Sequence, residues 1–330
     1  MADAGTARLT AALAAAGVSW DQVADRRSLT GGTFNAVHLV SLADGTRLVV
    51  KIPPGPETPL LRYERGILGT EALYYELAGQ CADVTVPAVV AVDPAGATGG
   101  YLVMTHCPGS PWPELAPSPS GSERDELRAA LGRQVARLHT ITGTGFGYPS
   151  LAVGPLRGSW RAAFADMVNA VLADAGTFAV TLPRPAADIQ DWFTARAAVL
   201  DQVTTPVLVH FDLWDGNVLV ESGSAGRRIG ALIDAERAFW GDPLAELVSL
   251  ALFGDIEQDS AFLQGYRAAG GTVTFDQATR QRLSLYRAYL YLIMWVEAVP
   301  RQCSRERRDW LLARVVRPLT AAFDDGSPHL

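Results

Sequence analysis

The residues with the clearest chemical pattern lie in the stretch His210–Asn217, which reads HFDLWDGN. This stretch has the form H-x-D-L-x-x-x-N, with a carboxylate five residues before a neutral amide. In phosphoryl-transfer sites an aspartate at this position accepts the proton of the attacking hydroxyl, and the asparagine offers a hard oxygen to Mg²⁺. We therefore expect Asp212 to be a catalytic base and Asn217 a metal ligand. An ordinary polar loop is the alternative reading.

A second acidic stretch, Ile233-Asp234-Ala235-Glu236, follows an apolar run typical of a β-strand. Asp234 lies 17 residues after Asn217. A carboxylate placed directly after a strand points out of the end of the sheet, where a cation can bind. We expect Asp234 to be a second Mg²⁺ ligand rather than the cap of a turn. Glu236 is expected to be either a further ligand or a hydrogen-bond acceptor beside one.

The chain contains a single lysine, Lys51, and its other 27 basic residues are arginine. A lysine kept in such a chain suggests a site that needs a compact ammonium, although chance could leave one too. Lys51 ends the second strand of a predicted hairpin. Upstream, residues 30–35 read TGGTFN. There Gly31, Gly32 and Thr33 are candidates for backbone contacts to phosphate oxygens that Lys51 also reaches. Glycine pairs mostly mark turns, so this hypothesis depends on Lys51.

A helical glutamate is expected to pair with Lys51 and aim it at the phosphates. The stretch 63–80 has helical periodicity and carries three candidates, Glu64, Glu71 and Glu76. Glu71 lies well inside the stretch and is the one we assign. This assignment depends on the phosphoryl-transfer interpretation and does not support it independently.

The elements that must position these residues fall into two parts. The N-terminal part, residues 1–106, is expected to hold an alanine-rich helix, a hairpin with Asp44-Gly45 at its turn, a helix and two more strands. Residues 107–122 are rich in proline, serine and glycine and form the candidate boundary. Residues 107–330 are mainly helical in pattern, with a small β region. The sequence thus predicts an α+β fold with a small antiparallel N-terminal lobe and a larger helical C-terminal lobe. The strands of the two parts are expected at 36–42, 46–52, 84–92, 100–104, 207–210, 218–220 and 229–233, and the helix that opens the larger part at 123–140.

Composition excludes several classes of protein. The 330 residues carry 28 basic and 35 acidic side chains, a net charge of −7, which disfavours a nucleic-acid binder. The apolar runs are far shorter than a membrane span, and the N-terminus lacks the pattern of a signal peptide. Three widely spaced cysteines suggest free thiols in a reducing compartment. We expect a cytoplasmic protein with no nucleic-acid or membrane partner, and the sequence leaves the oligomeric state open.

The order of these motifs resembles the aminoglycoside phosphotransferase-like family of small-molecule kinases. The resemblance extends from about Leu29 to Pro300 and includes G-G-T-x-N, the lysine strand, the H-x-D-x-x-x-x-N loop, the strand followed by aspartate, and G-D-P at 241–243. It implies a bilobed protein-kinase-like fold that transfers the γ-phosphate of ATP, or of GTP, to a hydroxyl. It also implies a hinge near residues 105–108, where Thr105 and Cys107 would lie beside the adenine.

By this resemblance Asp212 is the base, Asn217 and Asp234 hold Mg²⁺, and Lys51 and Glu71 form the pair that orients the phosphates. The acceptor is expected to be a small hydroxylated molecule, such as an aminoglycoside-like antibiotic or an amino sugar. Every expected catalytic group is present, which argues against the alternative of a catalytically inactive kinase-like binding protein.

Some features depart from the usual pattern of the family. Only seven residues separate Asp234 from Asp242, which leaves no room for a platform that binds a peptide substrate. Phe211 replaces a small residue, and Glu246 replaces an aspartate. The run D-L-W-x-G-N also resembles the fructosamine kinase branch, so a ketosamine-directed repair enzyme is the alternative function.

The remaining expectations concern the acceptor and the supporting residues. Because a triphosphate makes the site negative, we expect a neutral or cationic acceptor, with Asp255, Glu257 and Asp259 as candidate contacts or, alternatively, as a solvated helix end. Trp214 and Trp240 are expected to be buried, His210 to support the loop, and Asp242 to cap a helix. The arginine-rich tail, which includes Arg301 and Arg305, is expected to be a solvated helix face.

Overall fold

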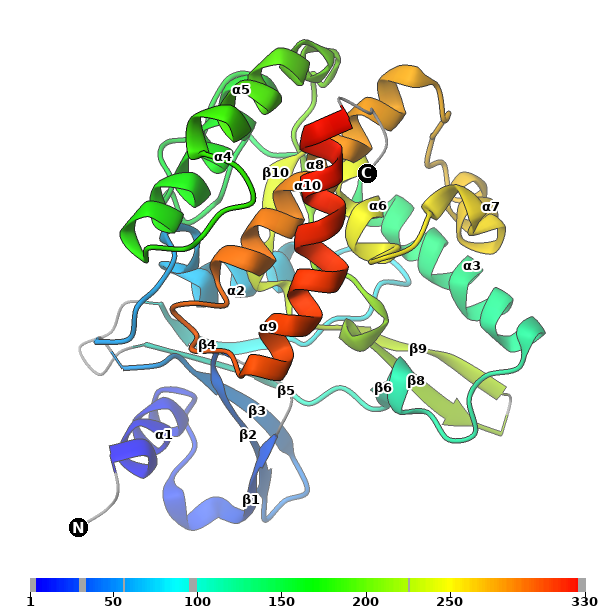
Figure 1. Cartoon of the computed structure of the whole chain (residues 1–330). Helices are drawn as coiled ribbons and strands as arrows, with labels where there is room; N and C mark the ends of the chain where they lie inside the picture. Colours follow the sequence, from blue (N-terminus) through cyan, green and yellow to red (C-terminus); the bar gives the residue numbers. More distant parts are fainter. Residues whose placement is uncertain (1–3, 30–33, 56, 95–99, 225, 326–330) are drawn as a thin grey trace.

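The computed structural model describes residues 4–29, 34–55, 57–94, 100–224 and 226–325 (Figure 1). Its N-terminal part is built on a five-stranded antiparallel sheet with the strand order β1-β2-β3-β5-β4. Two helices, α1 (Ala4–Ala15) and α2 (Ile67–Ala78), pack with this sheet. Its strands are β1 (Val23–Leu29), β2 (Ala36–Leu42), β3 (Arg47–Ile52), β4 (Val89–Asp93) and β5 (Tyr101–Thr105).

Strand β5, which lies between β3 and the edge strand β4, sends its side chains to both faces of the sheet. Val103 packs with Leu9 and Leu13 of α1 in a small core of its own. Leu102 and Met104 belong instead to the large core that includes α2. Successive side chains of a strand point to opposite faces, so α1 covers one face and α2 joins the other face to the rest of the molecule.

The larger C-terminal part is mainly helical and contains two small sheets. In one, β6 (Ser110–Pro111), β8 (Val218–Gly223) and β9 (Gly226–Leu232) pair in the order β6-β8-β9, and in the other β7 (Val207–Val209) pairs with β10 (Phe239–Gly241). In Figure 1 the sheet with α1 lies at one end of the molecule, and α4 and α5 lie at the other. The helices are α3 (Gly121–Leu138), α4 (Trp160–Thr177), α5 (Ala186–Arg196), α6 (Leu244–Leu250), α7 (Ser260–Ala268), α8 (Gln277–Val296), α9 (Arg305–Leu311) and α10 (Arg317–Asp325).

Short helical turns connect these elements, and two of them carry residues of interest. The turn Asp215–Asn217 closes the H-x-D-L-x-x-x-N stretch, and the turn Ala235–Arg237 follows Asp234. A π-helical stretch, Leu312–Val316, joins α9 to α10. The other 3₁₀ turns are Trp20–Gln22, Arg62–Glu64, Trp112–Glu114, Ala197–Gln202 and Ile256–Gln258.

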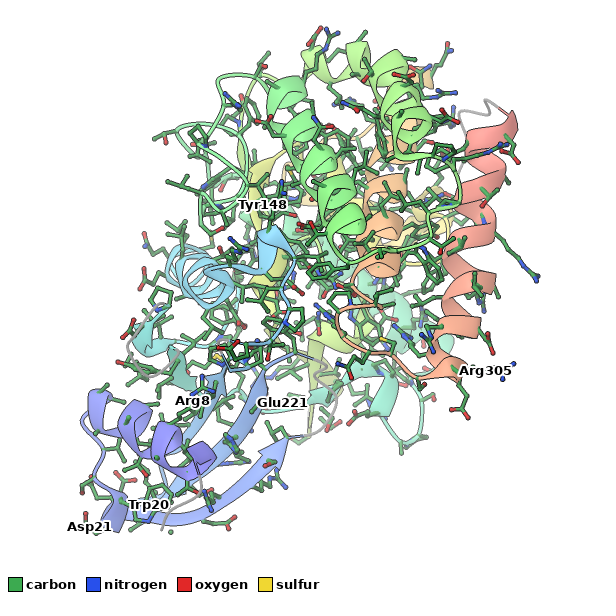
Figure 2. All side chains as sticks on the ribbon, turned by 60° about the vertical axis from the view of Figure 1, so that its left-hand side comes forward. Arg8, Trp20, Asp21, Tyr148, Glu221 and Arg305 are labelled. Carbon is green, nitrogen blue, oxygen red and sulfur yellow. The ribbon has the colours of Figure 1, made fainter. Side chains whose placement is uncertain are left out.

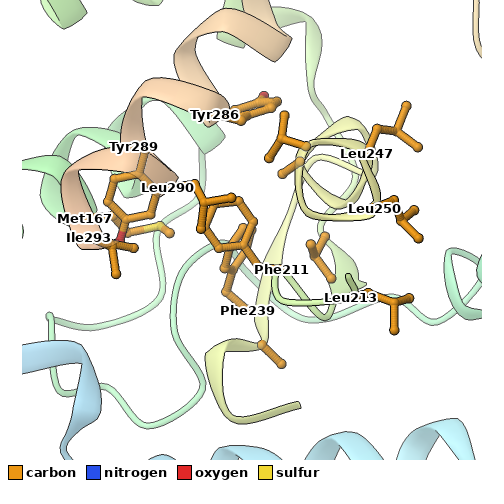
Figure 3. Close-up of a cluster of buried hydrophobic side chains, with 14 of the residues drawn as sticks. Met167, Phe211, Leu213, Phe239, Leu247, Leu250, Tyr286, Tyr289, Leu290 and Ile293 are labelled. Carbon is orange, nitrogen blue, oxygen red and sulfur yellow. The ribbon is translucent and has the colours of Figure 1, made fainter. Parts of the chain in front are cut away.

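The stretch 210–217 lies on a hydrophobic core between α6 and α8 (Figure 3). Phe211 and Leu213 are fully buried in this core. The ring of Phe211 lies 4.9 Å from that of Phe239 and 5.8 Å from that of Tyr289 between centroids. The residues on either side of Asp212 are therefore anchored in the interior, which fixes the backbone that carries its carboxylate. The other labelled members of the cluster are Met167, Leu247, Leu250, Tyr286, Leu290 and Ile293.

The two parts also meet through aromatic side chains. Tyr148 of the larger part lies beside the segment that leads into α2 (Figure 2), and its ring stacks on that of Tyr63 with centroids 5.8 Å apart. Trp20 and Asp21 lie at the outer end of the N-terminal part in the same view. The entry to α2 is therefore one place where the two parts pack against each other.

Helices α3 and α7 approach each other closely at two glycines. A Cβ atom at Gly265 would lie 1.9 Å from the backbone oxygen of Ala129, and one at Gly132 would lie 2.2 Å from that of Phe262. The two helices thus pack backbone against backbone, and a larger residue at either position would have to push them apart.

The predicted α+β fold, with a small antiparallel part and a larger helical part, is confirmed. The sequence did not predict β1, because most of its residues are exposed and carry no alternating apolar pattern. Strand β4 begins at Val89, five residues later than expected, after Pro87, which lacks the N–H group that a strand interior needs. Trp240 is buried as predicted, but the prediction for Trp214 is wrong, since this side chain is 41% exposed.

A change of sheet marks the place where the two parts of the chain meet. The five-stranded sheet ends at Thr105, and the chain joins the sheet of β8 at Ser110. The division of the chain into residues 1–106 and 107–330 stays a prediction, to which this change of sheet lends support.

Across the described residues, no helix combines the length and apolar character needed to span a membrane.

Candidate active site

Lys51 lies on β3 between Val37 of β2 and Leu102 of β5, so strands on both sides fix its backbone. Its side chain is 7% exposed. The ammonium Nζ lies 2.7 Å and 2.9 Å from the two carboxylate oxygens of Glu71, and 2.5 Å from Oδ1 of Asp234. Burial disfavours the ammonium, but the carboxylates of Asp234 and Glu71 outweigh it and raise the pKa of Lys51. The structure thus places Lys51 and Glu71 together.

Tyr75 links the lysine pair to the second acidic stretch. It lies one helical turn after Glu71 on α2, and its hydroxyl donates to Oε1 of Glu71 at 2.6 Å. The same hydroxyl accepts the backbone N–H of Asp234 at 2.8 Å. Burial raises the pKa of Glu71, and the Lys51 ammonium opposes this rise. One buried phenol therefore sets the distance between α2 and the strand end that carries Asp234.

Glu246 of α6 holds the backbone before Asp212. Its Oε2 accepts the N–H of His210 at 2.8 Å, and its Oε1 accepts the N–H of Phe211 at 3.0 Å. One turn on, the hydroxyl of Ser249 accepts the N–H of Leu213 at 3.1 Å. Phe211 adopts a left-handed backbone conformation, with φ of 62°, which is uncommon for a bulky residue. Burial raises the pKa of Glu246 to about 7, although the two N–H groups pull it down.

Asn217 and His210 tie the two ends of the loop together. The Asn217 amide Nδ2 donates to the backbone oxygen of Asp212 at 2.7 Å, which leaves the Oδ1 atom as the group that a hard cation would use. His210 is fully buried, and its Nε2 lies 3.0 Å from the backbone oxygen of Ile233, the residue before Asp234. Burial lowers the pKa of His210 to about 4, so the ring is neutral at pH 7 and acts as a structural link, as expected from the sequence.

The Asp212 carboxylate has charged neighbours of both signs. Its side chain is 21% exposed, and its Oδ1 lies 3.8 Å from Nη1 of Arg237. Burial raises the pKa of Asp212 to about 7, while Arg237 lowers it and Asp234 raises it further. A carboxyl group that titrates near pH 7 has a proton affinity suited to a general base.

Three carboxylates converge where a cation would bind. Oxygens of Glu71, Asp234 and Glu236 all lie within 4.8 Å of one another. Asp234 has a left-handed backbone, with φ of 65°, and Oε2 of Glu236 accepts a hydrogen bond from Asn35 at 2.9 Å. Burial and the neighbouring Asp234 raise the pKa of Glu236 to about 8, although the Lys51 ammonium opposes this rise. Hard oxygen donors in this arrangement fit Mg²⁺.

Two of the remaining residues predicted to contact the nucleotide, Thr105 and Cys107, lie at the end of β5 and just after it. Thr105 ends β5, and its hydroxyl accepts the N–H of Ala88 at 2.9 Å, so this side chain already has a structural partner. Cys107 follows as a half-buried free thiol whose pKa is raised by burial. Gly31, Gly32 and Thr33 lie outside the described residues.

The three acids proposed as acceptor contacts all have partners within the protein. Glu257 forms two hydrogen bonds of 2.8 Å with Arg280. Asp259 accepts from Arg128 at 2.7 Å and caps α7. Asp255 accepts the N–H of Glu257 at 2.9 Å. These contacts favour the alternative, a helix end, over direct contact with an acceptor, but Glu257 and Asp259 are paired with arginines and only partly exposed rather than solvated.

Sequence reasoning missed three residues near Asp212. Arg237 is 7% exposed and faces the Asp212 carboxylate. Its other terminal nitrogen, Nη2, donates to both carboxylate oxygens of Glu297, at 3.1 Å and 3.0 Å. Arg301 was expected on a solvated helix face, which is wrong, because its side chain is 12% exposed and contacts Glu64 and Glu297. The spacing of Glu297 and Arg301, one helical turn, was the available signal.

Comparison with known proteins now identifies the family. Residues 25–286 match the sequence model of the phosphotransferase enzyme family. The chain therefore belongs to this family, as its motifs predicted, and it is a small-molecule kinase. It is 26% identical over 281 residues to a protein of Synechocystis sp. named "Probable ketoamine kinase", with 81% of this chain and 83% of that protein covered.

Solved structures share the fold. A candidate fructosamine-3-kinase of Thermobifida fusca superposes with a TM-score of 0.66 at 23% identity, over 94% of this chain and all of its own. An aminoglycoside phosphotransferase in complex with ADP and hygromycin B gives 0.63 at 19% identity, over 96% and 98%. A macrolide 2′-phosphotransferase of Brachybacterium faecium gives 0.59 at 22%, over 93% and 97%. These likenesses establish the bilobed kinase-like fold.

Proposed function

We propose that this protein transfers the γ-phosphate of ATP, or of GTP, to a hydroxyl of a small sugar-like molecule that is neutral or carries an amine. The observation that carries the proposal is that Lys51 contacts both Glu71 and Asp234, which belong to elements far apart in the sequence. An ammonium fixed by two carboxylates at the end of a sheet is suited to hold phosphate oxygens. The loop that carries Asp212 is joined to the strand end before Asp234, because Nε2 of His210 lies 3.0 Å from the backbone oxygen of Ile233.

The proposed mechanism assigns each group one task. Asp212 accepts the proton of the acceptor hydroxyl, or orients that oxygen, as the oxygen attacks the γ-phosphorus in line. Lys51 binds oxygens of the α- and β-phosphates, and Glu71 keeps its ammonium in place. Asn217 and Asp234, with Glu236 beside them, would hold Mg²⁺, which neutralises phosphate charge when bound. Thr105, Cys107 and the glycine stretch at 31–33 are proposed to line the nucleotide.

A ketoamine is the second candidate acceptor. The sequence D-L-W-D-G-N at 212–217 resembles the fructosamine kinase branch, and two of the relatives carry ketoamine or fructosamine kinase names. The exposed indole of Trp214 lies in this run, two residues after Asp212. Phosphorylation of a ketoamine would be a repair reaction, whereas phosphorylation of an antibiotic would confer resistance. We place either reaction in the cytoplasm, in agreement with the three free cysteines.

A direct transfer assay tests the proposal. Purified protein would be incubated with γ-labelled ATP or GTP, with Mg²⁺ or with EDTA, and with aminoglycosides, macrolides, amino sugars and fructosamines in turn. We expect label in one class of acceptor, only with Mg²⁺, and a loss of label with Asp212→Asn. Tight nucleotide binding without transfer to any acceptor would contradict the proposal and favour an inactive binding protein.

A further inference from the structure

A chain of buried charges runs from the entry of α2 to Asp212. Arg301 donates from Nη2 to Oε1 of Glu64 at 2.6 Å, and the same nitrogen lies 3.2 Å from Oε2 of Glu297. Glu297 in turn accepts both hydrogen bonds of Arg237. None of these four side chains is more than 12% exposed. The charges of Arg237 and Arg301 are balanced by those of Glu64 and Glu297. Asp212, at the end of the chain, therefore shares Arg237 with Glu297.

The geometry of Arg237 makes Glu297 the group that aims it. A guanidinium is planar, so fixing Nη2 by two contacts to one carboxylate also fixes the direction of Nη1. Nη1 is the atom that lies 3.8 Å from Oδ1 of Asp212, too far for a hydrogen bond. Arg237 Nε is buried and forms no hydrogen bond within the described residues. Glu297 is therefore the contact that holds the guanidinium against Asp212.

The other end of the chain reaches the nucleotide side. Glu64 accepts the N–H of Leu61 at 2.7 Å and lies three residues before the start of α2, the helix of Glu71. The guanidinium of Arg301 lies over the ring of Phe34, 5.5 Å from its centroid. Phe34 is followed by Asn35, the partner of Glu236. Glu297 and Arg301 thus contact both the arginine that faces Asp212 and the segments beside the carboxylate cluster.

Stability alone does not explain this arrangement. Buried ion pairs contribute little net stability, because the loss of water around each charge offsets the attraction between them. Their fixed directions do position charges accurately. We propose that Glu297 is a positioning residue for phosphoryl transfer, which holds Arg237 against Asp212 and so fixes the Asp212 carboxylate for the acceptor hydroxyl. This inference rests on the proposed function, in which Asp212 is the base.

Glu297→Gln tests the inference, because it keeps the volume and removes the charge. We expect kcat to fall on the order of 10- to 100-fold, with KM for nucleotide and acceptor changed less than about twofold, since a misplaced group impairs catalysis more than binding. Glu297→Asp, which retains the carboxylate, should recover part of kcat. Glu257→Gln is the matched control: it also removes a carboxylate bonded twice to one arginine, but far from this chain of charges, and it should leave kcat unchanged.

A double-mutant cycle separates positioning from general damage. If Glu297 acts through Asp212, Glu297→Gln should cost less than about twofold in the Asp212→Asn background. An equal loss in both backgrounds, or an unchanged kcat in the single variant, would overturn the inference. A crystal structure of the Glu297→Gln variant tests the inference without an acceptor. Arg237 Nη1 should move away from Asp212, and an unmoved Arg237 would also overturn the inference. Failure of the parent protein to phosphorylate any acceptor would instead refute the proposed function.

Discussion

Oε2 of Glu246 accepts the backbone N–H of His210 at 2.8 Å, across 36 residues of sequence. The second oxygen accepts the next N–H, that of Phe211, and so helps to hold this residue in its strained left-handed conformation. A carboxylate on α6 therefore bends the backbone that presents Asp212. The longer side chain of glutamate performs this task where the family resemblance led us to expect aspartate.

Replacing Glu246 by glutamine should destabilise the protein and slow the reaction. The amide NH₂ would face one of the two N–H groups, leaving a buried donor unpaired, at a cost of about 1–3 kcal/mol. We expect a lower melting temperature and a lower kcat, measured by calorimetry and by the transfer assay. Glu257→Gln, at a partly exposed position, is the control and should change neither the melting temperature nor kcat. An unchanged melting temperature in Glu246→Gln would mean that the backbone holds its shape unaided.

Asp212→Asn should lower kcat on the order of 10²–10⁴-fold and leave nucleotide binding nearly intact. Because the pKa of Asp212 is raised to about 7, the base is ionised only above that pH, so kcat/KM of the parent should rise with pH and level off above about 7. The variant's residual activity should lack this rise. Turnover near the parent's value would refute the assignment of Asp212.

The raised pKa of Asp212 should also make the stability of the folded protein depend on pH. The folded protein holds the Asp212 proton up to about pH 7, whereas the unfolded chain releases it near 3.8. The folded state therefore binds more protons between these values, and this group's contribution to stability is lost as pH rises through 7. The melting temperature of Asp212→Asn relative to the parent should thus be higher at pH 8 than at pH 5. The opposite order would show that Arg237 keeps Asp212 ionised.

Lys51→Arg should lower kcat/KM on the order of 10²-fold although the charge is kept. The arginine fork is larger and planar, and the space between Glu71 and Asp234 is built around a single ammonium nitrogen. Arg47→Lys, the reverse exchange on the same strand at an exposed position, is the matched control and should be silent. An active Lys51→Arg would mean that the unique lysine is an accident of codon usage.

Gly265→Ala should destabilise the protein by about 3 kcal/mol, because the new methyl group would meet the Ala129 backbone oxygen at 1.9 Å. Gly176→Ala, in α4, meets no atom within 4 Å and should be neutral or slightly stabilising. Thermal unfolding of the two variants compares them directly. Equal melting temperatures would show that α3 and α7 can separate without cost.

Much of the fold was predictable because its signals are local. The strands 36–42 and 218–220, and the helix near 123–140, are apolar at the spacing of their element, and the structure places them within a few residues of those bounds. Local patterns likewise pointed to Lys51, Asp212 and Asp234, and the kinase interpretation built on them led to Glu71. Strand β1 carried no such signal because its side chains are mostly exposed.

Contacts between distant segments could not be predicted in this way. Arg301 looks like one of many tail arginines, and only its partners Glu64 and Glu297, brought together by the fold, make it a buried residue. The acids at 255, 257 and 259 looked like an attractive surface for a cation, but Arg280 and Arg128 neutralise two of them in space. Pairing of charges depends on tertiary structure, which the spacing of residues along the chain does not reveal.

Because Lys51 is the single lysine of the chain, the fraction of protein with nucleotide bound beside it can be measured directly. A nucleotide analogue with a reactive acyl phosphate would deliver its acyl group to an amine beside the phosphates, and this chain offers one ε-amine in all. Acylation there abolishes the single tryptic cleavage after lysine, between Lys51 and Ile52, while every cleavage after arginine persists. One fused peptide in a mass spectrum would therefore report how much of a sample, pure or in a crude extract, had its nucleotide pocket filled.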